Sequence, residues 1–239
     1  MSSVLSQQTE ADDYLFTPPP RVAIPVLGSA SQFPVHRVYC VGRNYADHVA
    51  EMGGDPKAEP PVFFSKPASA LVPNAQEICY PQATSDLHHE VELVVALGAG
   101  GSDLSLERAA GCVLGYGVGI DFTRRDLQAE AKKHGRPWDT AKGFDQSAPV
   151  SVLTLVSDIE LAADARIALE VNGKLRQEAT LGQMLWSVPE ILVQLSQLFE
   201  LKPGDIIFTG TPAGVAATEA GDKLSASIAG LEPLNFTLI

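Results

Sequence analysis

Two glutamates, Glu90 and Glu92, stand two residues apart in the segment 88–95, which reads HHEVELVV. Side chains of a β-strand alternate between its two faces, so both carboxylates are expected on one face. Neighbouring like charges are unfavourable unless a cation lies between them, and hard divalent cations prefer oxygen ligands. The alternative is a solvated acidic strand face. The apolar residues that follow Glu92 favour the end of a buried strand instead.

A third carboxylate, Asp121, follows the glycine-rich segment 114–120 (LGYGVGI), which we predict to be a strand with close backbone packing. Together with Glu90 and Glu92 it would supply three carboxylates, with room left for water and substrate oxygens. Such a ligand set suits Mg²⁺ or Mn²⁺. The sequence therefore predicts a magnesium or manganese site at Glu90, Glu92 and Asp121.

A histidine and a glutamate, His48 and Glu51, are three positions apart in a short helix predicted over 44–52, with Asn44 as its N-cap. A carboxylate beside an imidazole orients the ring and stabilises its charged form, which is typical of a general base. The alternative is an exposed helical ion pair. The pair therefore matters for catalysis only if it lies beside the acidic cluster.

Two lysines, Lys66 in FSKP and Lys142 in WDTAKGFD, lie in segments with aromatic neighbours. A partly buried lysine near a metal can anchor a substrate carboxylate or stabilise an enolate oxygen. A solvated loop lysine is the alternative for both positions.

The segment DFTRRDLQ, which begins at Asp121, combines an acid with two guanidinium groups and an amide. If Asp121 binds a metal, Arg125 and Gln128 could bind an anionic, oxygen-rich ligand. The alternative is a set of surface ion pairs along a helix, among Arg124, Arg125, Asp126 and Glu130.

A glycine-rich loop, TGTPAGV from Thr209, follows a predicted strand at 206–208. Loops of this kind can bind a carboxylate through backbone N–H groups. The loop lacks the G-K-[ST] ending of a phosphate-binding P-loop, and the chain has no G-x-S-x-G motif.

Composition narrows the function classes. The 239 residues suit one domain, with 45% hydrophobic and 19% charged residues and a net charge of −12. The absence of a basic run disfavours nucleic-acid and membrane partners. The negative charge also repels anionic substrates at long range, so a site for them needs local cations.

The cysteines and the N-terminus indicate a cytoplasmic protein. Cys40, Cys79 and Cys112 are widely spaced, and we predict reduced, buried thiols. The sequence has no run of about 18 consecutive apolar residues and no signal-peptide pattern. Residues 1–13 are predicted to be mobile, and Pro18–Pro20 to give an extended lead-in.

The remaining pattern predicts a β-rich α+β domain with a few peripheral helices. Strands are expected at 38–42, 62–64, after Glu92, at 167–171 and at 206–208, and Asn172-Gly173 predicts a type I′ hairpin. Helices are expected from Ser105 to Ala110 and from Met184 to Phe199. The second helix should point a set of apolar residues to the core: Leu185, Val188, Leu192, Leu195 and Leu198.

The order and spacing of these motifs resemble the fumarylacetoacetate hydrolase family, in its short acylpyruvate hydrolase branch. The motifs that carry the resemblance are VGRNYADH from Val41, FSKP from Phe64, HHEVEL from His88, G-x-D-x-T-x-R-D-x-Q from Gly119, KGF from Lys142, VNG from Val171 and GDIIFTGTPAGV from Gly204. The first 35 residues resemble, more loosely, the N-terminal extension of bacterial fumarylpyruvate hydrolases. We therefore divide the chain into an extension, 1–35, and a catalytic domain, 36–239.

The resemblance implies a mixed β-sandwich roll and a homodimer. It assigns the metal to Glu90, Glu92 and Asp121. It assigns catalysis to His48, Glu51 and Lys142, and substrate contacts to Arg125, Gln128 and Thr211. We add Lys66 as a substrate-binding candidate. The residues that select the substrate are expected outside the shared motifs, in the loop 53–61.

The activity that the resemblance implies is metal-dependent hydrolysis of a carbon–carbon bond in a 2,4-dioxo acid. The expected substrate is fumarylpyruvate, cleaved to fumarate and pyruvate in a gentisate-type pathway of aromatic catabolism. Three alternatives use the same metal–enolate site: oxaloacetate decarboxylation, oxo-acid tautomerisation and dienoate hydration. A fourth, from another class, is a protein that binds Mg²⁺ and a 2-oxo acid without turnover.

Overall fold

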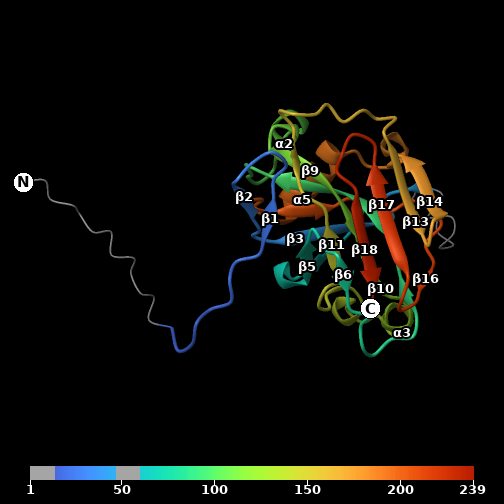
Figure 1. The fold of residues 1–239 in the computed structure, drawn as a ribbon. Helices are drawn as coiled ribbons and strands as arrows, with labels where there is room; N and C mark the ends of the chain where they lie inside the picture. The colour runs from blue at the N-terminus through green and yellow to red at the C-terminus, as the bar shows by residue number, and fades with distance from the viewer. Residues whose placement is uncertain (1–13, 47–59) are drawn as a thin grey trace, which may run out of the picture.

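The structure is a computed structural model that describes residues 14–46 and 60–239. These ranges form a β-rich α+β domain in which two sheets stack and short helices lie at the periphery (Figure 1). The predicted fold class is confirmed. Two predictions concern residues outside the described ranges: the mobility of residues 1–13 and most of the helix over 44–52.

The largest sheet of the described ranges has eight strands and carries the candidate site at one end. Its order is β4-β3-β15-β8-β9-β11-β5, and β12 pairs with β9. The strands are β3 (Val38–Gly42), β4 (Val62–Lys66), β5 (Leu71–Pro73), β8 (Val91–Leu97), β9 (Val113–Ile120), β11 (Ala148–Val150), β12 (Thr154–Leu155) and β15 (Ile206–Phe208). The predicted strands at 38–42, 62–64 and 206–208 and after Glu92 are thereby confirmed.

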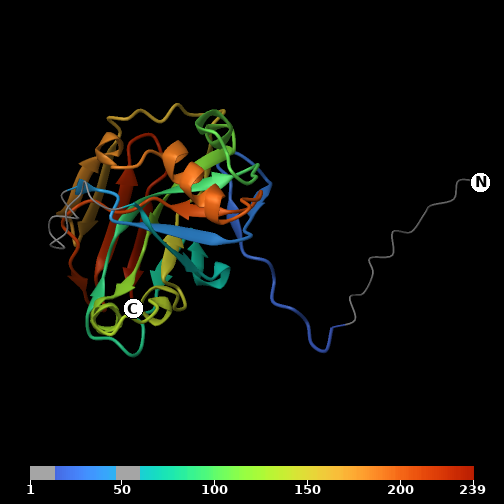
Figure 2. The ribbon, with the colours of Figure 1, turned by 180° about the vertical axis from the view of Figure 1, so that it is seen from behind.

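A second sheet, in the order β14-β13-β17-β18-β6, stacks on the first (Figure 2). Its strands are β6 (Glu77–Ile78), β13 (Arg166–Val171), β14 (Lys174–Thr180), β17 (Lys223–Ile228) and β18 (Leu234–Leu238). The turn from β13 to β14 has φ of 53° at Asn172 and 69° at Gly173. Positive φ at both positions is the geometry of the predicted type I′ hairpin.

Two smaller sheets complete the described strands. One is the hairpin of β1 (Ala23–Pro25) and β2 (Gln32–Pro34). The other, in the order β10-β7-β16, joins three two-residue strands near the candidate site: β7 (Leu87–His88), β10 (Thr123–Arg124) and β16 (Ala217–Thr218).

The central strand β8 is buried on both faces because each face meets a different hydrophobic cluster. Leu93 and Val95 belong to the large core that contains side chains of the second sheet. Val94 and Ala96 belong to a smaller core, which contains Ile24 and Phe33 from the β1–β2 hairpin. A strand covered on both faces reads as a continuous apolar run, as the sequence after Glu92 does. The division at residue 35 stays a prediction, although this hairpin packs on the main sheet.

The described helices lie around the sheets: α2 (Leu106–Ala110), α3 (Arg125–Lys133), α4 (Asp139–Lys142) and α5 (Val188–Leu198), with the 3₁₀ turns η1 (Ala68–Ala70) and η2 (Leu181–Gln183). Ser105 caps α2 by accepting a hydrogen bond from the backbone N–H of Arg108, so the helix start predicted at Ser105 is confirmed.

The predicted helix 184–199 begins later than expected. Ser187 and Glu190 form a capping box at its first turn, so α5 starts at Val188, and η2 precedes it. The core face consists of Ile191, Leu192 and Leu195. The expectation that Leu185 and Leu198 point to the core is wrong, because they are 37% and 63% exposed, one before the helix and one at its last residue.

All three cysteines are free, and Cys40 and Cys112 are buried. The expectation of a buried thiol is wrong for Cys79, which follows the edge strand β6 and is exposed. None of the helices in the described ranges has the length and apolar character needed to span a membrane.

Candidate active site

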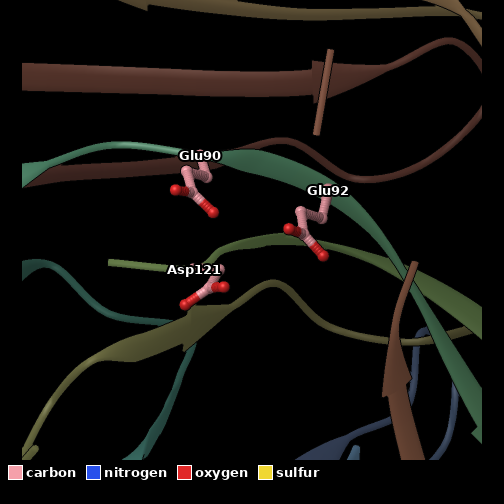
Figure 3. Close-up of side chains that lie close together, drawn as sticks. All are labelled: Glu90, Glu92 and Asp121. Carbon is pink, nitrogen blue, oxygen red and sulfur yellow. The ribbon is translucent and has the colours of Figure 1, made fainter. Parts of the chain in front are cut away.

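Three carboxylates from two neighbouring strands meet at the end of the main sheet (Figure 3). Glu90 immediately precedes β8, Glu92 lies within it, and Asp121 immediately follows β9. The two strands are antiparallel, with Glu92 opposite Gly119, and the Asp121 N–H donates to the Glu90 carbonyl at 2.8 Å. One carboxylate oxygen from each residue lies within 4.8 Å of the others. The three side chains lie together, as the spacing predicted.

Close backbone packing sets the register of this end of the sheet. At Gly119 an added Cβ would lie 2.6 Å from side-chain atoms of both Phe208 and Val94. A larger residue there would force the three central strands apart. The glycine-rich sequence before Asp121 therefore serves the packing role that we predicted.

Glu92 differs from the other two carboxylates of the triad because its hydrogen-bond partner is a backbone N–H and not a lysine. It is 2% exposed and accepts a 2.8 Å hydrogen bond from the backbone N–H of Gly210. Gly210 can approach because it has a φ of 99°, and a Cβ there would lie 2.7 Å from Asn44. Burial raises the pKa of Glu92 well above its usual range, and the charges of Asp121 and Glu90 raise it further. The solvated-face alternative is thereby excluded.

Lys66, at the end of β4, lies behind Asp121. Its Nζ is 2.8 Å from Asp121 Oδ1 and also donates to the Phe122 carbonyl at 3.2 Å, to the Ser147 hydroxyl at 3.0 Å and to the Lys142 carbonyl. Lys66 is buried, so a solvated loop position is excluded. Its predicted role in substrate binding stays a prediction.

Lys142, the last residue of α4, points into the triad from the other side. Its Nζ lies 2.5 Å from Asp121 Oδ2 and 2.8 Å from Glu90 Oε2. Burial alone would lower the pKa of Lys142, but the charges and hydrogen bonds of Asp121 and Glu90 raise it above its usual value. The side chain is 3% exposed and remains an ammonium at neutral pH. It is therefore a fixed positive charge beside the carboxylates.

The donor set fits a hard divalent cation. All three side chains are buried, and all offer oxygen, the ligand atom that Mg²⁺ and Mn²⁺ prefer. Lys142 touches Glu90 and Asp121, whereas the carboxylate of Glu92 has a backbone N–H as its partner. A buried carboxylate that has no cation beside it is stabilised most when a cation binds next to it. The residues present can therefore hold a metal, and Mg²⁺ and Mn²⁺ suit them equally.

Arg125 and Gln128 line the same cleft, one turn apart on α3. Arg125 donates to Glu90 Oε1 at 2.5 Å and to Gln128 Oε1 at 2.6 Å. The alternative of surface pairing along the helix is wrong for Arg125, because its guanidinium faces the triad. Its contact to Gln128 leaves the amide nitrogen of Gln128 available for a ligand oxygen.

Gln177 on β14 is a buried residue that the sequence reasoning missed. Its Oε1 accepts the backbone N–H of Val91 at 3.1 Å and lies 2.9 Å from His89 Nδ1. Its Nε2 donates to Thr211 Oγ1 and to the Pro212 carbonyl, both at 2.8 Å. Because the Thr211 oxygen accepts this hydrogen bond, its own proton is directed elsewhere, and Thr211 lines the cleft. Only the side-chain hydrogen bonds of Gln177 to segments distant in the sequence reveal this arrangement.

The two residues of the predicted general base, His48 and Glu51, lie outside the described residues. The chain just before them is anchored beside the site through Asn44. The Asn44 amide donates to the Thr209 carbonyl at 2.8 Å and accepts the Trp186 N–H at 2.7 Å. Arg43 and Gly42 line the cleft itself.

Three buried carboxylates and a fixed ammonium lie beside a cleft at one end of two stacked sheets, and this donor set could hold a divalent metal. The chain belongs to the fumarylacetoacetate hydrolase family. The family model described as fumarylacetoacetate (FAA) hydrolase C-terminal matches residues 37–239.

Similar proteins carry two different activities in their names. Fumarylpyruvate hydrolase from Pseudomonas aeruginosa, solved in complex with Mn²⁺ and pyruvate, is 48% identical, with a TM-score of 0.93 over 95% of this chain and 99% of that one. The mitochondrial oxaloacetate tautomerase FAHD1 of Rattus norvegicus is 43% identical over 83% of this chain and 90% of its own length. The oxaloacetate tautomerase YcgM of Escherichia coli K12 is 39% identical over 85% of this chain and 93% of its own.

Proposed function

We propose that this protein hydrolyses the carbon–carbon bond of a 2,4-dioxo acid, with fumarylpyruvate as the substrate and fumarate and pyruvate as the products. The observation that carries the proposal is the buried triad of Glu90, Glu92 and Asp121 with Lys142 among its carboxylates. Acylpyruvates of this kind arise when aromatic rings are cleaved, and we place the reaction in such a catabolic pathway. A cytoplasmic homodimer is the form in which we expect the enzyme.

The cofactor we propose is Mg²⁺ or Mn²⁺, held by Glu90, Glu92 and Asp121. When bound, such an ion supplies Lewis-acid assistance to the 2-oxo acid end of a substrate. The protein's part is to bind and orient that end. Arg125 offers a guanidinium, Gln128 an amide N–H and Thr211 a hydroxyl, and all three line the cleft beside the triad. Charge-assisted hydrogen bonds of this type hold carboxylates in one orientation.

We assign the proton transfers to His48 and the stabilisation of the enolate to Lys142. His48, oriented by Glu51, takes a proton from water, and the water oxygen adds to the carbonyl carbon at position 4 of the substrate. The bond between carbons 3 and 4 then breaks, and its electron pair forms the enolate of pyruvate. The ammonium of Lys142 stabilises the enolate charge. The protonated His48 gives its proton to carbon 3 of the enolate, which completes pyruvate and restores the base, and the acyl half leaves as fumarate.

The choice of fumarylpyruvate is supported by the N-terminal residues. The family model begins at residue 37, whereas the match to the P. aeruginosa hydrolase covers 95% of the chain. That match must include most of the extension, where β1 and β2 pack against the main sheet.

The test is an assay of fumarylpyruvate with purified protein, with Mn²⁺ or with excess chelator. We expect metal-dependent loss of the enol absorbance, with pyruvate and fumarate formed in equal amounts. His48→Ala should abolish product formation while Mn²⁺ binding stays nearly intact. Full activity in this variant would contradict the assigned base, and the absence of both products in the wild-type assay would contradict the proposed reaction.

A second candidate is oxaloacetate tautomerisation, which the curated relatives at 39–43% identity favour. Tautomerisation moves a proton and breaks no carbon–carbon bond. Conversion of enol to keto oxaloacetate without release of pyruvate, at a higher kcat/KM than fumarylpyruvate hydrolysis, would favour this candidate. Insensitivity of that turnover to His48→Ala would separate the two mechanisms further.

A further inference from the structure

A row of two aromatic rings between two lysines lines the cleft and begins at the triad. Lys142 Nζ lies 4.9 Å from the centroid of the Phe64 ring, and the rings of Phe64 and Trp138 are 5.9 Å apart, edge to face. Lys132 Nζ in turn lies 5.3 Å from the centroid of the Trp138 ring. All four side chains line the cleft. The wall therefore has an ammonium at each end and an apolar, planar surface between them.

The two ammonium groups differ in what they contact. Lys142 is engaged by Glu90 and Asp121, as described above. Lys132 has no carboxylate partner among the residues that the structure describes. Its neighbour Lys133 is paired with Glu130, which also contacts His134. In a chain with a net charge of −12, a lysine that faces the cleft without an acidic partner is available for an anionic ligand.

The surroundings of Lys132 concentrate positive charge at this end of the cleft. Arg43 lines the cleft, and Arg125 lies two turns earlier on α3, roughly 10 Å along the helix axis. Partial burial of its ammonium group lowers the pKa of Lys132, and the charges of Arg125 and Arg43 lower it further, while Glu90 raises it. A negatively charged group placed beside Lys132 would relieve this repulsion.

We propose that Lys132 is a specificity-determining residue that binds the distal carboxylate of a dianionic substrate whose unsaturated middle lies along Phe64 and Trp138. The inference rests on the proposed function, because the 2-oxo acid end must lie at the triad for the distal end to reach Lys132. It places substrate selection on α3, in addition to the loop 53–61, which lies almost entirely outside the described residues. Substrates with two carboxylates are preferred over those with an uncharged tail.

The test uses two ligands that lack the 4-oxo group and so cannot be cleaved. 2-Oxopimelate and 2-oxoheptanoate share one carbon chain and differ in the terminal carboxylate. Calorimetric titration in the presence of Mn²⁺ gives the affinity of each ligand for the wild-type chain, for Lys132→Met, for Lys132→Arg and for the matched control Lys133→Met. Because turnover is not needed, failure of the hydrolase assay and failure of this inference are separate results.

We expect wild-type protein to bind the diacid about two- to fivefold more tightly than the monoacid, the range of one partly exposed charge pair. Lys132→Met should remove most of this preference, while Lys132→Arg and Lys133→Met retain it. High salt should reduce the preference in the wild-type chain. Two results would overturn the inference: equal affinity of wild-type protein for both ligands, or a preference that survives in Lys132→Met.

Discussion

The two ends of the cleft are built differently. The inner end stands on the central strands β8 and β9, with its carboxylates and both of its lysines, Lys66 and Lys142, buried. The outer end is carried by the short helix α3 and the residues before α4, where Lys132 is exposed and Trp138 half-buried. Charges at the inner end are paired with one another, whereas Lys132 has an aromatic ring as its described partner.

This difference between the two ends indicates that the inner end serves the reaction and the outer end serves the choice of substrate. Buried, mutually paired charges are costly to move, so the inner end can hold a metal and, under the proposed function, the 2-oxo acid end of the substrate in one geometry. An exposed cation on a short helix costs little to replace, so the outer end can change its ligand preference without disturbing the sheet. Substitutions at the inner end should therefore affect reaction rate, and those at the outer end should affect the choice of substrate.

The largest effect is expected at the inner end, from Glu92→Gln. Replacement of this ligand should weaken Mn²⁺ binding by at least about a hundredfold, because even partners outside the ligand set typically account for 10–100-fold. Calorimetric titration with Mn²⁺ measures this change. The exposed Glu130→Gln is the matched control and should bind Mn²⁺ as the wild-type chain does.

The same variant tests whether the carboxylate of Glu92 lowers the stability of the metal-free protein. Glu92 is buried beside two other carboxylates, so its neutral replacement should raise Tm in the presence of chelator. Mn²⁺ should raise Tm in the wild-type chain and not in Glu92→Gln. Equal Mn²⁺ affinity in the two proteins would contradict the metal assignment.

A smaller effect is expected behind the inner end, from the contact between Gln177 and Thr211. Gln177→Met and Thr211→Val should each lower kcat/KM, by about tenfold, since one loses the amide that holds the hydroxyl and the other loses the hydroxyl itself. A double-mutant cycle measures their coupling. If Gln177 acts through Thr211, kcat/KM of the double variant should be little lower than that of the less active single variant.

Mn²⁺ affinity is the control readout for this cycle. Gln177 contacts none of the triad carboxylates among the described residues, so the affinity should remain near that of the wild-type chain. Multiplicative losses in kcat/KM, with an equal fall in metal affinity, would show that Gln177 acts only on stability.

The smallest effect is expected away from both ends, at the capping box of α5. Ser187→Ala should reduce the free energy of unfolding by about 1 kcal/mol and leave the kinetics unchanged, because it removes a helix cap that does not line the cleft. Denaturant unfolding measures the change. Altered kcat/KM in this variant would contradict the separation of the helix from the site.

The pH dependence of this cap follows from Glu190. Hydrogen bonds from the Ser187 hydroxyl and N–H lower the pKa of Glu190 below its ordinary value of 4.5. A carboxylate with a lowered pKa contributes stability above its unfolded pKa, and the contribution disappears as the pH falls through the folded pKa. The stability difference between wild-type protein and Glu190→Gln should therefore be present at neutral pH and vanish in acid.

The sequence predicted the inner end well because local spacing determines it. Glu90 and Glu92 share a strand face through a period of two residues, and Asp121 follows the strand that pairs with theirs. The Asn172-Gly173 turn and the helix start at Ser105 were also local and were predicted correctly. Each of these features depends on residues close together in the chain.

The features that the sequence did not reveal depend on tertiary contacts. Gln177 is far from His89 and Thr211 in the chain, and it lies between them only through tertiary contacts of its side chain. Lys132 and Lys133 are adjacent and identical in type, and only the packing of Trp138 distinguishes them. The start of α5 was misplaced because apolar spacing continues through the turn that precedes the Ser187 cap.

The proposed hydrolase activity is tested most directly by comparing kcat/KM for fumarylpyruvate hydrolysis and for oxaloacetate tautomerisation in one Mn²⁺-loaded preparation. Product analysis must accompany both assays, so that release of pyruvate is measured together with loss of the enol. We predict the higher value for fumarylpyruvate, with pyruvate and fumarate in equal amounts. A higher value for oxaloacetate, with no cleavage of fumarylpyruvate, would contradict the proposal.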